Sequence, residues 1–525
     1  MSSKCPSTAD PFPSQNLSTK QARLQTPLTP LDTNQYCLTI TPSILERLLF
    51  MYQIVKDIPS VVFRGYDIRG LVDQELTADT YYTFGRAYAT WLSERRINEC
   101  VVGHDCRLSS PDFAKAIIAG LNDGGVNTYY IGDTLSQIIY FSNYEFKTKG
   151  AVMITASHNP KEFNGLKLGT GYSETMLTDE VIAFRELCHS LKFVEPSVKG
   201  QNTELDILGA YKKHLLKHFN LTKKWKVVVD GCCTGSGRIY PEILREAGCE
   251  VIEQNCTPDG NFPMGVPDPT ESEVLERLGE GVRKAGADIG FAYDTDGDRM
   301  STVDETGRPI WMDVNVALFA KDVLSTIPGA PIVYNTLCSR AVTETIEKAG
   351  GKPVMWMTGH SFIKAKVAQE RAPFGGELSG HIYFTDNYYG HDDGAYASLR
   401  LLSFLEREGK SLSEAVADLP QYFSSPEIKL GLADDIKFKF IDTKIREDFQ
   451  KYWPTASYVT IDGVRADLED RMVILRASQN GPYITIKFEG KTQEIYDEMK
   501  STIREILKSH PEIDWNAGVN THAFD

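Results

Sequence analysis

The chain has 525 residues, of which 42% are hydrophobic and 24% charged, and its formal net charge at pH 7 is −15. This length exceeds what one hydrophobic core supports, so we expect several domains. The acidic balance disfavours a nucleic-acid binder, which needs a basic face, and no apolar run approaches the ~18 residues of a membrane span.

The ten cysteines show neither paired CxxC nor Cys/His metal spacing. We therefore expect reduced thiols rather than a zinc site or a disulfide framework. No charged-then-apolar secretory signal opens the chain. These features together predict a cytoplasmic protein with no membrane or nucleic-acid partner.

Residues 1–45 are rich in Ser, Thr, Pro and Gln and show no apolar period. They are predicted to form a poorly ordered extension. A transit peptide is the alternative, and the lack of a basic amphipathic pattern disfavours it.

After the extension, short β-branched runs alternate with helical patterns, which is typical of α/β units. Three strands end in comparable turns, in ECVVGHDCR, KVVVDGCCTG and PIVYNTLCSRA, and each precedes an amphipathic stretch. From about residue 425, strands YVTIDGVRADL, RMVILRAS and PYITIKFEG precede one helix, which predicts a smaller α+β domain. The predicted domains are 46–198, 199–306, 307–422 and 423–525.

The stretch TASHNP follows an apolar strand and exposes Ser157 beside His158 on a turn. Ordinary turn chemistry is one interpretation. A serine hydroxyl is a weak nucleophile unless it is activated, and without a Gly-x-Ser-x-Gly elbow an acyl-transfer hydrolase is disfavoured, even with His158 as a candidate base. If Ser157 carries a phosphoryl group of about −1.5 to −2 charges, it needs a metal ion and cations nearby.

In FAYDTDGDRM, Asp294, Asp296 and Asp298 alternate in a turn after an apolar strand. Such oxygen clusters select hard divalent cations. A solvated acidic turn and an EF-hand loop are the alternatives. The EF-hand is disfavoured because Arg299 stands where its sharp turn needs Gly. Arg299 beside three acids instead indicates an anionic ligand.

Two further stretches suit sugar hydroxyls and a phosphate, although each pattern also occurs in ordinary turns. In GGELSGH, Glu377, Ser379 and His381 alternate between glycines, a pattern that suits sugar hydroxyls, although a capped Gly-rich turn is equally compatible. In RASQNGP, a phosphate nest is predicted, and its candidate side chains are Arg476, Ser478 and Asn480. Arg69 in FRGYDIRG and Lys167 in NGLKLG supply the cations that a phosphoryl group requires.

Five ordered stretches, FRGYDIRG, TASHNPKEFNGLK, DTDGDR, GGELSGH and RASQNGP, resemble the α-D-phosphohexomutase family over about residues 60–510. The similarity is greatest to its phosphomannomutase/phosphoglucomutase branch. The resemblance implies three related mixed α/β domains and a smaller fourth domain around a central cleft, a monomer or homodimer, bound Mg²⁺ and hexose phosphates as partners. It also implies rotation of the last domain about a hinge near 420–428.

The resemblance also implies a role for each matching residue. Ser157 would be a phosphoserine that phosphorylates a hexose phosphate, with hexose 1,6-bisphosphate as intermediate and activator, so that the 1-phosphate and 6-phosphate interconvert. The implied Mg²⁺ ligands are a phosphoserine oxygen of Ser157, Asp294, Asp296 and Asp298. The implied catalytic residues are Ser157, His158, Lys167, Arg69, Arg299 and His381. The implied substrate-binding residues are Glu377, Ser379, Arg476, Ser478, Asn480 and Tyr66.

The chain departs from the family pattern at Met357, where a lysine is common, at His104, where an arginine is common, and at Gln479-Asn480, which replaces an Asn-Thr pair. These changes bear on sugar preference. With Leu378, the GELSGH stretch is closer to the pattern of enzymes for glucose and mannose phosphates than to that of glucosamine mutases, which more often have a polar residue at this position. A hexose-bisphosphate synthase, a phosphoglucosamine mutase, a metal-dependent phosphatase and a non-catalytic sugar-phosphate binder are the alternatives. The last is disfavoured because a binder needs no phosphorylatable serine.

Overall fold

The computed structural model describes residues 52–525 except residue 480, and the predicted extension 1–45 lies outside the described residues. The described chain contains four β-sheets. The first three mix parallel strands with an antiparallel hairpin and are covered by helices, and the fourth is antiparallel. The predicted mixed α/β class with a separate C-terminal sheet is therefore confirmed.

The first sheet has the order β1-β5-β4-β2-β3-β7, with β6 paired to β5. Its strands are β1 (Ile68–Leu71), β2 (Glu99–His104), β3 (Asn127–Asp133), β4 (Gly150–Ile154), β5 (Phe163–Gly171), β6 (Glu174–Thr175) and β7 (Asn202–Glu204). The helices of this part are η1 (Ser60–Val62), α2 (Ala78–Glu94), α3 (Ser110–Asp123), α4 (Ser136–Phe146) and α5 (Thr178–Ser190).

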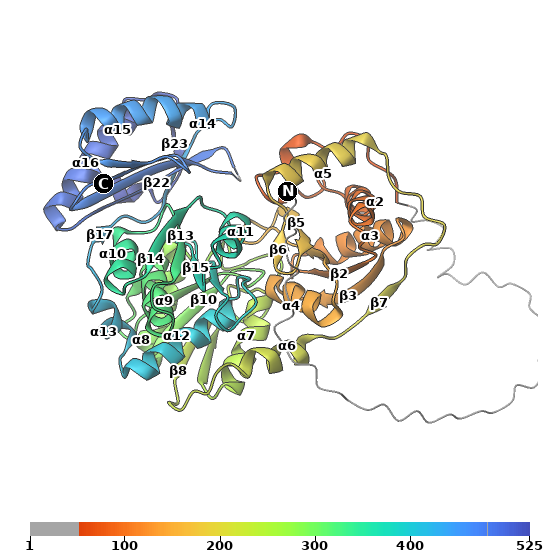
Figure 1. Cartoon of the computed structure of the whole chain (residues 1–525), viewed down its shortest axis with the longest axis horizontal. Coiled ribbons are helices and arrows are strands. Elements are labelled where there is room, and N and C mark those ends of the chain that lie inside the picture. Colours follow the sequence, from red (N-terminus) through yellow and green to blue (C-terminus); the bar gives the residue numbers. More distant parts are fainter. Residues whose placement is uncertain (1–51, 480) are drawn as a thin grey trace, which may run out of the picture. The chain divides into compact units, whose positions relative to one another are not determined.

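Alternation along β2 and β4 explains how helices cover both faces of this sheet (Figure 1). Val102 and Ile154 belong to the core that contains residues of α2, α3 and α5. Their neighbours Val101 and Met153 pack instead with Ile139 of α4. Because successive strand residues point to opposite faces, α4 covers the face away from α2. Strand β4 is thereby buried on both sides, and its carboxyl end leads directly into the turn at 155–160.

The second sheet has the order β12-β11-β10-β8-β9. Its strands are β8 (Lys226–Asp230), β9 (Glu250–Gln254), β10 (Ile289–Tyr293), β11 (Met300–Val303) and β12 (Pro309–Ile310). The helices are α6 (Leu208–Leu216), α7 (Gly235–Glu246) and α8 (Ser272–Ala285). Strands β10 and β11 are antiparallel, so the acidic turn 294–299 is the tip of a buried hairpin.

The third sheet has the order β14-β13-β15-β16. Its strands are β13 (Pro331–Asn335), β14 (Lys352–Trp356), β15 (Phe374–Gly376) and β16 (Ile382–Phe384). The helices are α9 (Met312–Thr326), α10 (Arg340–Lys348), α11 (His360–Glu370), α12 (Gly394–Glu408) and α13 (Leu412–Ala417). The stretch 377–381, which the sequence predicts to bind sugar hydroxyls, forms the turn between β15 and β16.

The fourth sheet has the order β19-β20-β21-β22-β18-β23, with β17 paired to β22. Its strands are β17 (Phe423–Ser424), β18 (Ile428–Gly431), β19 (Ser457–Val459), β20 (Val464–Asp467), β21 (Arg471–Ala477), β22 (Tyr483–Gly490) and β23 (Asp514–Val519). The helices are α14 (Lys437–Phe440), η2 (Ile441–Ile445), α15 (Arg446–Tyr452), α16 (Gln493–Lys508) and η3 (Thr521–Phe524).

One predicted strand of this sheet is wrong. The stretch YVTIDGVRADL forms two strands, β19 and β20, because Gly463 takes a positive φ of 84° and turns the chain between them. The predicted helix is confirmed as α16, which buries Met499, Ile503 and Ile506.

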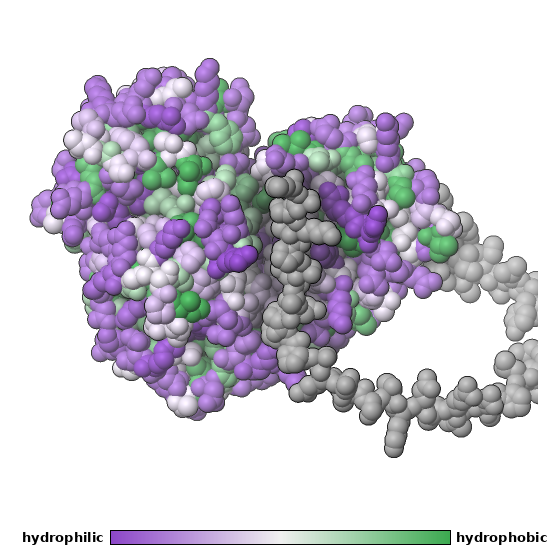
Figure 2. Space-filling view, viewed as in Figure 1, coloured by the Kyte–Doolittle hydropathy of each residue, from purple (hydrophilic) through white to green (hydrophobic). Residues whose placement is uncertain are grey.

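The surface seen in Figure 2 is mainly hydrophilic, and hydrophobic residues occur there singly or in small groups. Within the described residues, no helix combines the length and the apolar character that crossing a bilayer requires.

Candidate active site

Strand residues of the first and fourth sheets, together with turn and loop residues next to the second and third sheets, line one cavity. The predicted site residues among its walls are Tyr66, Arg69, Ser157, His158, Lys167, Arg299, Glu377, Ser379, His381, Arg476 and Ser478. Asp294, Asp296 and Asp298 contact this group through hydrogen bonds and ion pairs. Asn480 lies outside the described residues.

The turn that carries Ser157 is held in an unusual backbone conformation. Ser157 has a φ of 49°, in the left-handed region that non-glycine residues seldom adopt, and its N–H donates to Thr155 Oγ1 at 2.8 Å. The buried guanidinium of Arg107 donates to the carbonyl oxygens of Ser157 and Asn159 at 2.6 and 2.7 Å. It also donates to those of Pro160 and Phe163, and it pairs with Asp105 at 3.0 Å.

The Ser157 side chain is aimed at the acidic turn. Its Oγ donates to Asp294 Oδ2 at 3.0 Å and lies 3.2 Å from His158 Nδ1. Burial and the nearby guanidinium of Arg299 lower the pKa of His158 well below its usual value. His158 is therefore a neutral imidazole near pH 7, in contact with the serine oxygen.

The three aspartates form a buried oxygen cluster whose ligand atoms all lie within 4.8 Å of one another. One oxygen of Asp296 and one of Asp298 are buried without a hydrogen-bond partner among the described residues. Burial, together with the neighbouring carboxylates, raises the pKa of Asp294 to about 7. An all-oxygen set with unsatisfied buried atoms and concentrated negative charge fits a hard divalent cation.

Lys167, on β5, places its ammonium against this cluster, 2.6 Å from Asp296 and 2.5 Å from Asp298. Burial lowers the pKa of Lys167, but these two carboxylates outweigh it and raise the pKa well above its usual value. Lys167 is therefore a permanent cation at the floor of the cavity.

Two guanidinium groups flank the serine. Arg299 donates through Nε to Asp294 at 2.8 Å and lies 3.3 Å from Asp268, while its buried Nη2 has no partner among the described residues. Arg69 donates to Asp67 and to Asn159 Oδ1, both at 2.9 Å. Both groups are thus fixed by buried partners, and Arg299 retains a free donor for an anion.

The wall that the third sheet supplies is suited to hydroxyl groups. Glu377 accepts from the N–H of Gly359 at 2.9 Å and from the hydroxyl of Tyr383 at 3.0 Å. His381 Nδ1 lies 2.8 Å from Asp392 and 3.7 Å from Asp298. Burial lowers the pKa of His381, but these two carboxylates outweigh it and the net shift is upward. His381 can therefore hold a proton near neutral pH.

The fourth sheet supplies Arg476, whose Nε donates to Asp462 Oδ2 at 2.8 Å. The same oxygen accepts from the N–H of Thr358 at 2.8 Å and from Thr336 Oγ1 at 3.1 Å. Asp462 therefore links Arg476, the candidate phosphate-binding residue on the fourth sheet, to Thr336 and Thr358, which follow strands of the third sheet.

The departures from the family pattern occupy different places. His104 is buried and bonds Tyr130 and the backbone of Asp105, so it belongs to the packing of the first sheet. Met357 lines a neighbouring pocket rather than the cavity, and Gln479 borders both.

Several residues around the cavity were not singled out from the sequence. They are Arg107, Asp268, His360, Lys429, Asp462, Tyr483 and Thr485. His360 stands in the recognisable TGH and Arg107 in GHDCR, so those two carried a local signal. The others sit in ordinary strands and turns, and only the tertiary fold brings them to the cavity.

Comparisons with known proteins agree with this arrangement. Models of phosphoglucomutase/phosphomannomutase alpha/beta/alpha domains I, II and III match residues 60–183, 209–307 and 311–423. A phosphomannomutase/phosphoglucomutase of Pseudomonas aeruginosa is 38% identical over 454 residues, covering 86% of this chain and 96% of that protein. A phosphoglucomutase of Neisseria gonorrhoeae is 33% identical over 465 residues, covering 89% of this chain and 100% of that protein.

A solved structure gives the same result. The crystal structure of a phosphoglucomutase/phosphomannomutase family protein from Burkholderia thailandensis has a TM-score of 0.79 and 32% identity, over 86% of this chain and 98% of that one. Relatives with these names are isomerases that work by phosphoryl transfer, so this chain is an enzyme of that kind. The chain belongs to the phosphoglucomutase/phosphomannomutase family of α-D-phosphohexomutases, the hexose-phosphate mutases.

Proposed function

We propose that the protein interconverts the 1-phosphate and 6-phosphate of glucose and of mannose, through a phosphoserine at Ser157 and a hexose 1,6-bisphosphate intermediate. The observation that carries the proposal is the contact of Ser157 Oγ with Asp294 at 3.0 Å, at the wall of a cavity that also holds Arg299 and Glu377. A nucleophile, an anion-binding group and a hydroxyl-binding group thus face one space. The names of the relatives supply the two sugars.

We also propose Mg²⁺ as the metal. Asp294, Asp296 and Asp298 would hold it together with an oxygen of the phosphorylated Ser157, and it would neutralise charge on the phosphoryl group. Lys167 already provides one positive charge beside the same carboxylates.

In the proposed reaction the P–O bond to Ser157 Oγ breaks as a P–O bond to a sugar hydroxyl forms. The hydroxyl proton passes to a protein base, and Ser157 Oγ takes up a proton as it becomes a hydroxyl again. Arg69 and Arg299 offer fixed donors for the charge spread over the transferring group. His381 is the candidate to accept and return the proton. Lys167, which stays protonated beside its two carboxylates, would instead handle that hydroxyl by stabilising the negative charge that develops on its oxygen. In the second half the other phosphate of the bisphosphate returns to Ser157 Oγ, which gives up its hydroxyl proton, and a proton is delivered to the sugar oxygen that the phosphate leaves.

Binding of the sugar would fall to the remaining residues. Glu377, oriented by Gly359 and Tyr383, accepts from hydroxyl groups, and Ser379 both donates and accepts. Arg476 and Ser478 would bind the phosphate that is not being transferred, with Asn480 and Tyr66 as further predicted contacts. The partners are then small hexose phosphates. The cysteines that the structure describes are free thiols, in keeping with a cytoplasmic location.

A coupled assay tests the proposal with glucose 1-phosphate or mannose 1-phosphate, Mg²⁺ and a trace of the matching bisphosphate. We expect steady formation of the 6-phosphate by the wild type and a loss on the order of 1000-fold in Ser157→Ala, because the alanine cannot carry a phosphoryl group. Ser190→Ala, at an exposed serine of α5, is the matched control and should keep full activity. Equal rates in the wild type and Ser157→Ala, with both proteins folded, would refute the assignment.

A further inference from the structure

Three neighbouring strands of the fourth sheet present a row of polar side chains to the cavity. In the register of the sheet, Lys429 of β18 lies opposite Thr485 of β22, and Thr485 lies opposite Arg476 of β21. Residues directly opposite on adjacent antiparallel strands project from the same face. All three line the cavity, so an ammonium, a hydroxyl and a guanidinium stand side by side at its edge.

Thr485 is fully buried, yet its hydroxyl has no hydrogen-bond partner among the described residues. Buried polar atoms are nearly always satisfied, so an orphaned hydroxyl at a cavity wall indicates a group that arrives from outside the protein. A threonine hydroxyl donates one hydrogen bond, which suits an acceptor such as a phosphate oxygen.

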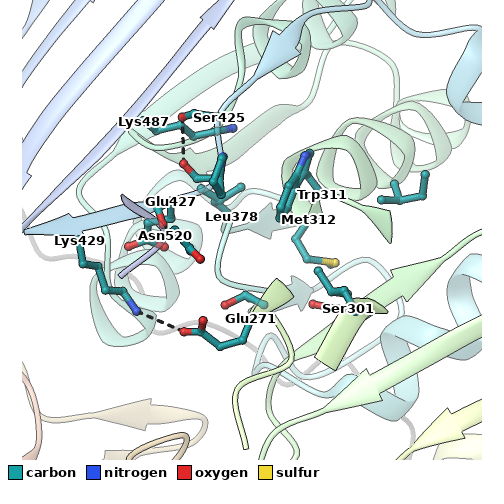
Figure 3. A pocket seen from close by; sticks show the side chains of 14 residues that line it. Glu271, Ser301, Trp311, Met312, Leu378, Ser425, Glu427, Lys429, Lys487 and Asn520 are labelled. Carbon is teal, nitrogen blue, oxygen red and sulfur yellow. Dashed lines mark hydrogen bonds and ion pairs between the residues drawn. The ribbon is translucent and has the colours of Figure 1, made fainter. Parts of the chain in front are cut away.

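Lys429 is a cation with a weak counter-ion. Among the described residues its ammonium pairs with Glu271 alone, at 4.0 Å, the outer limit for such a contact; Figure 3 draws this pair as a dashed line. Burial lowers the pKa of Lys429, but nearby acidic groups, Glu427 foremost, outweigh it and the net shift is upward. The side chain is therefore charged and only loosely held, at the border between the cavity and the pocket of Figure 3.

Arg476, at the other end of the row, uses only part of its guanidinium in a contact within the protein. Its Nε donates to Asp462, which orients the guanidinium; within the described part of the chain this leaves the terminal nitrogens for a ligand. A phosphate has three terminal oxygens with several lone pairs, more than one guanidinium can satisfy. Lys429 and Thr485 supply the complementary donors.

We propose that Lys429 and Thr485 are substrate-binding residues that extend the Arg476 phosphate site. They bind the phosphate group of the hexose phosphate that is not being transferred. This inference rests on the proposed function, since it assigns the ligand of that same cavity. Glu271 is the resting partner that Lys429 leaves when the phosphate binds.

Calorimetric titration with glucose 6-phosphate and steady-state kinetics test the proposal on the full chain. In Lys429→Met we expect binding weakened about 10-fold and a raised KM, with kcat within about 2-fold, because a charge-assisted contact is lost away from the reacting bond. Lys429→Arg should retain binding within about 3-fold, since the cation remains.

Thr485→Val, which keeps the shape and removes the hydroxyl, should weaken binding about 3-fold, and Thr485→Ser should restore it. In the double variant the loss of binding free energy should be smaller than the sum of the two single losses, because both side chains contact one phosphate. Lys451→Met, at an exposed lysine of the same sheet's domain, is the matched control and should leave every constant unchanged.

Wild-type-like affinity in both Lys429→Met and Thr485→Val would overturn this inference while leaving the mutase assignment intact. A wild-type protein that binds no hexose phosphate would overturn both. A loss of kcat without a change in binding would also contradict the assignment, because it would place these residues at the reacting phosphoryl group.

Discussion

At the scale of single residues, the site depends on charges that are buried and mutually constrained. Asp294 contacts both Ser157 and Arg299, and burial raises its pKa to about 7. Arg299 is shared between Asp294 and Asp268. These charged groups thus hold one another in place, which fixes their geometry before a ligand arrives and lowers the cost of reorganisation.

The raised pKa of Asp294 predicts pH-dependent metal binding. Below about pH 7 the metal-free carboxyl is protonated, so a cation must displace that proton, and apparent Mg²⁺ affinity should fall up to about 10-fold per pH unit below pH 7. Above pH 7 the carboxylate is already ionised and the affinity should level off. Mg²⁺ titrations of activity and calorimetry at pH 6, 7 and 8 measure this, and one constant affinity across the range would contradict it.

Asp268 provides a second test at this scale. Burial opposes ionisation of Asp268, but Arg299 outweighs it and holds the pKa well below the usual value. Asp268→Asn removes one of the two carboxylates that orient Arg299, so we expect kcat to fall about 10- to 100-fold with KM within about 3-fold. The exposed Asp435→Asn is the control. An unchanged kcat in Asp268→Asn would show that Arg299 needs no such support.

At the scale of elements, one motif of each of the first three sheets sits on a turn that directly follows a buried strand. Strand β4 leads into Ser157, β10 into the aspartates and β15 into Glu377. A buried strand has little freedom, so the first residues after it inherit a fixed position. The Ser157 turn needs more support because its backbone is in the left-handed region, and Arg107 supplies it through carbonyl contacts.

Arg107→Met should therefore release the Ser157 turn. It leaves Asp105 buried without its guanidinium partner, so we expect a stability loss of about 3–5 kcal/mol together with a large fall in kcat. Thermal melting and urea unfolding measure the first effect and the coupled assay the second. The exposed Arg96→Met is the control. A variant with wild-type melting temperature and activity would mean that the Ser157 turn keeps its conformation without Arg107.

At the scale of the whole molecule, polar contacts tie the fourth sheet to the third. Arg465 donates to the carbonyl oxygens of Thr336 and Cys338, both at 2.6 Å, and Lys487 pairs with Asp313 at 2.5 Å. Asp462 adds the link between Arg476 and Thr358. A phosphate bound by Arg476 is therefore connected, through one carboxylate, to the turn that precedes His360.

Asp462→Asn tests this connection. The amide accepts less strongly than a carboxylate and loses the charge pair with Arg476, so hexose-phosphate binding should weaken about 10-fold with a smaller change in kcat. Amide exchange of residues 357–360 should become faster in the same variant, which a purely local role of Asp462 would not produce. Unaltered exchange in that turn would limit the role of Asp462 to orienting Arg476.

Much of the site could be predicted because its chemistry lies in short stretches. Three alternating aspartates are a pattern that suits a divalent cation, and Glu377-x-Ser379 is one that suits hydroxyl groups; both can be found without any knowledge of the fold. Asp268, Asp462 and Lys429 gave no such signal, since their importance comes from strand register and from contacts across the chain. The alternation on both sides of Asp462-Gly463 predicts one long strand and hides the β19–β20 turn, although Asp-Gly is a turn signal. The domain boundaries remain predictions.

The most direct measurement of the central claim is site-specific phosphoryl transfer. Protein freed of phosphate is mixed with glucose 1,6-bisphosphate and Mg²⁺, and phosphopeptides are mapped by mass spectrometry as glucose 6-phosphate is added. We predict one phosphoryl group per chain, on Ser157, that is lost to the sugar phosphate as fast as the enzyme turns over. Phosphoryl uptake at another residue, equal uptake by Ser157→Ala, or no uptake by an active wild type would contradict the account.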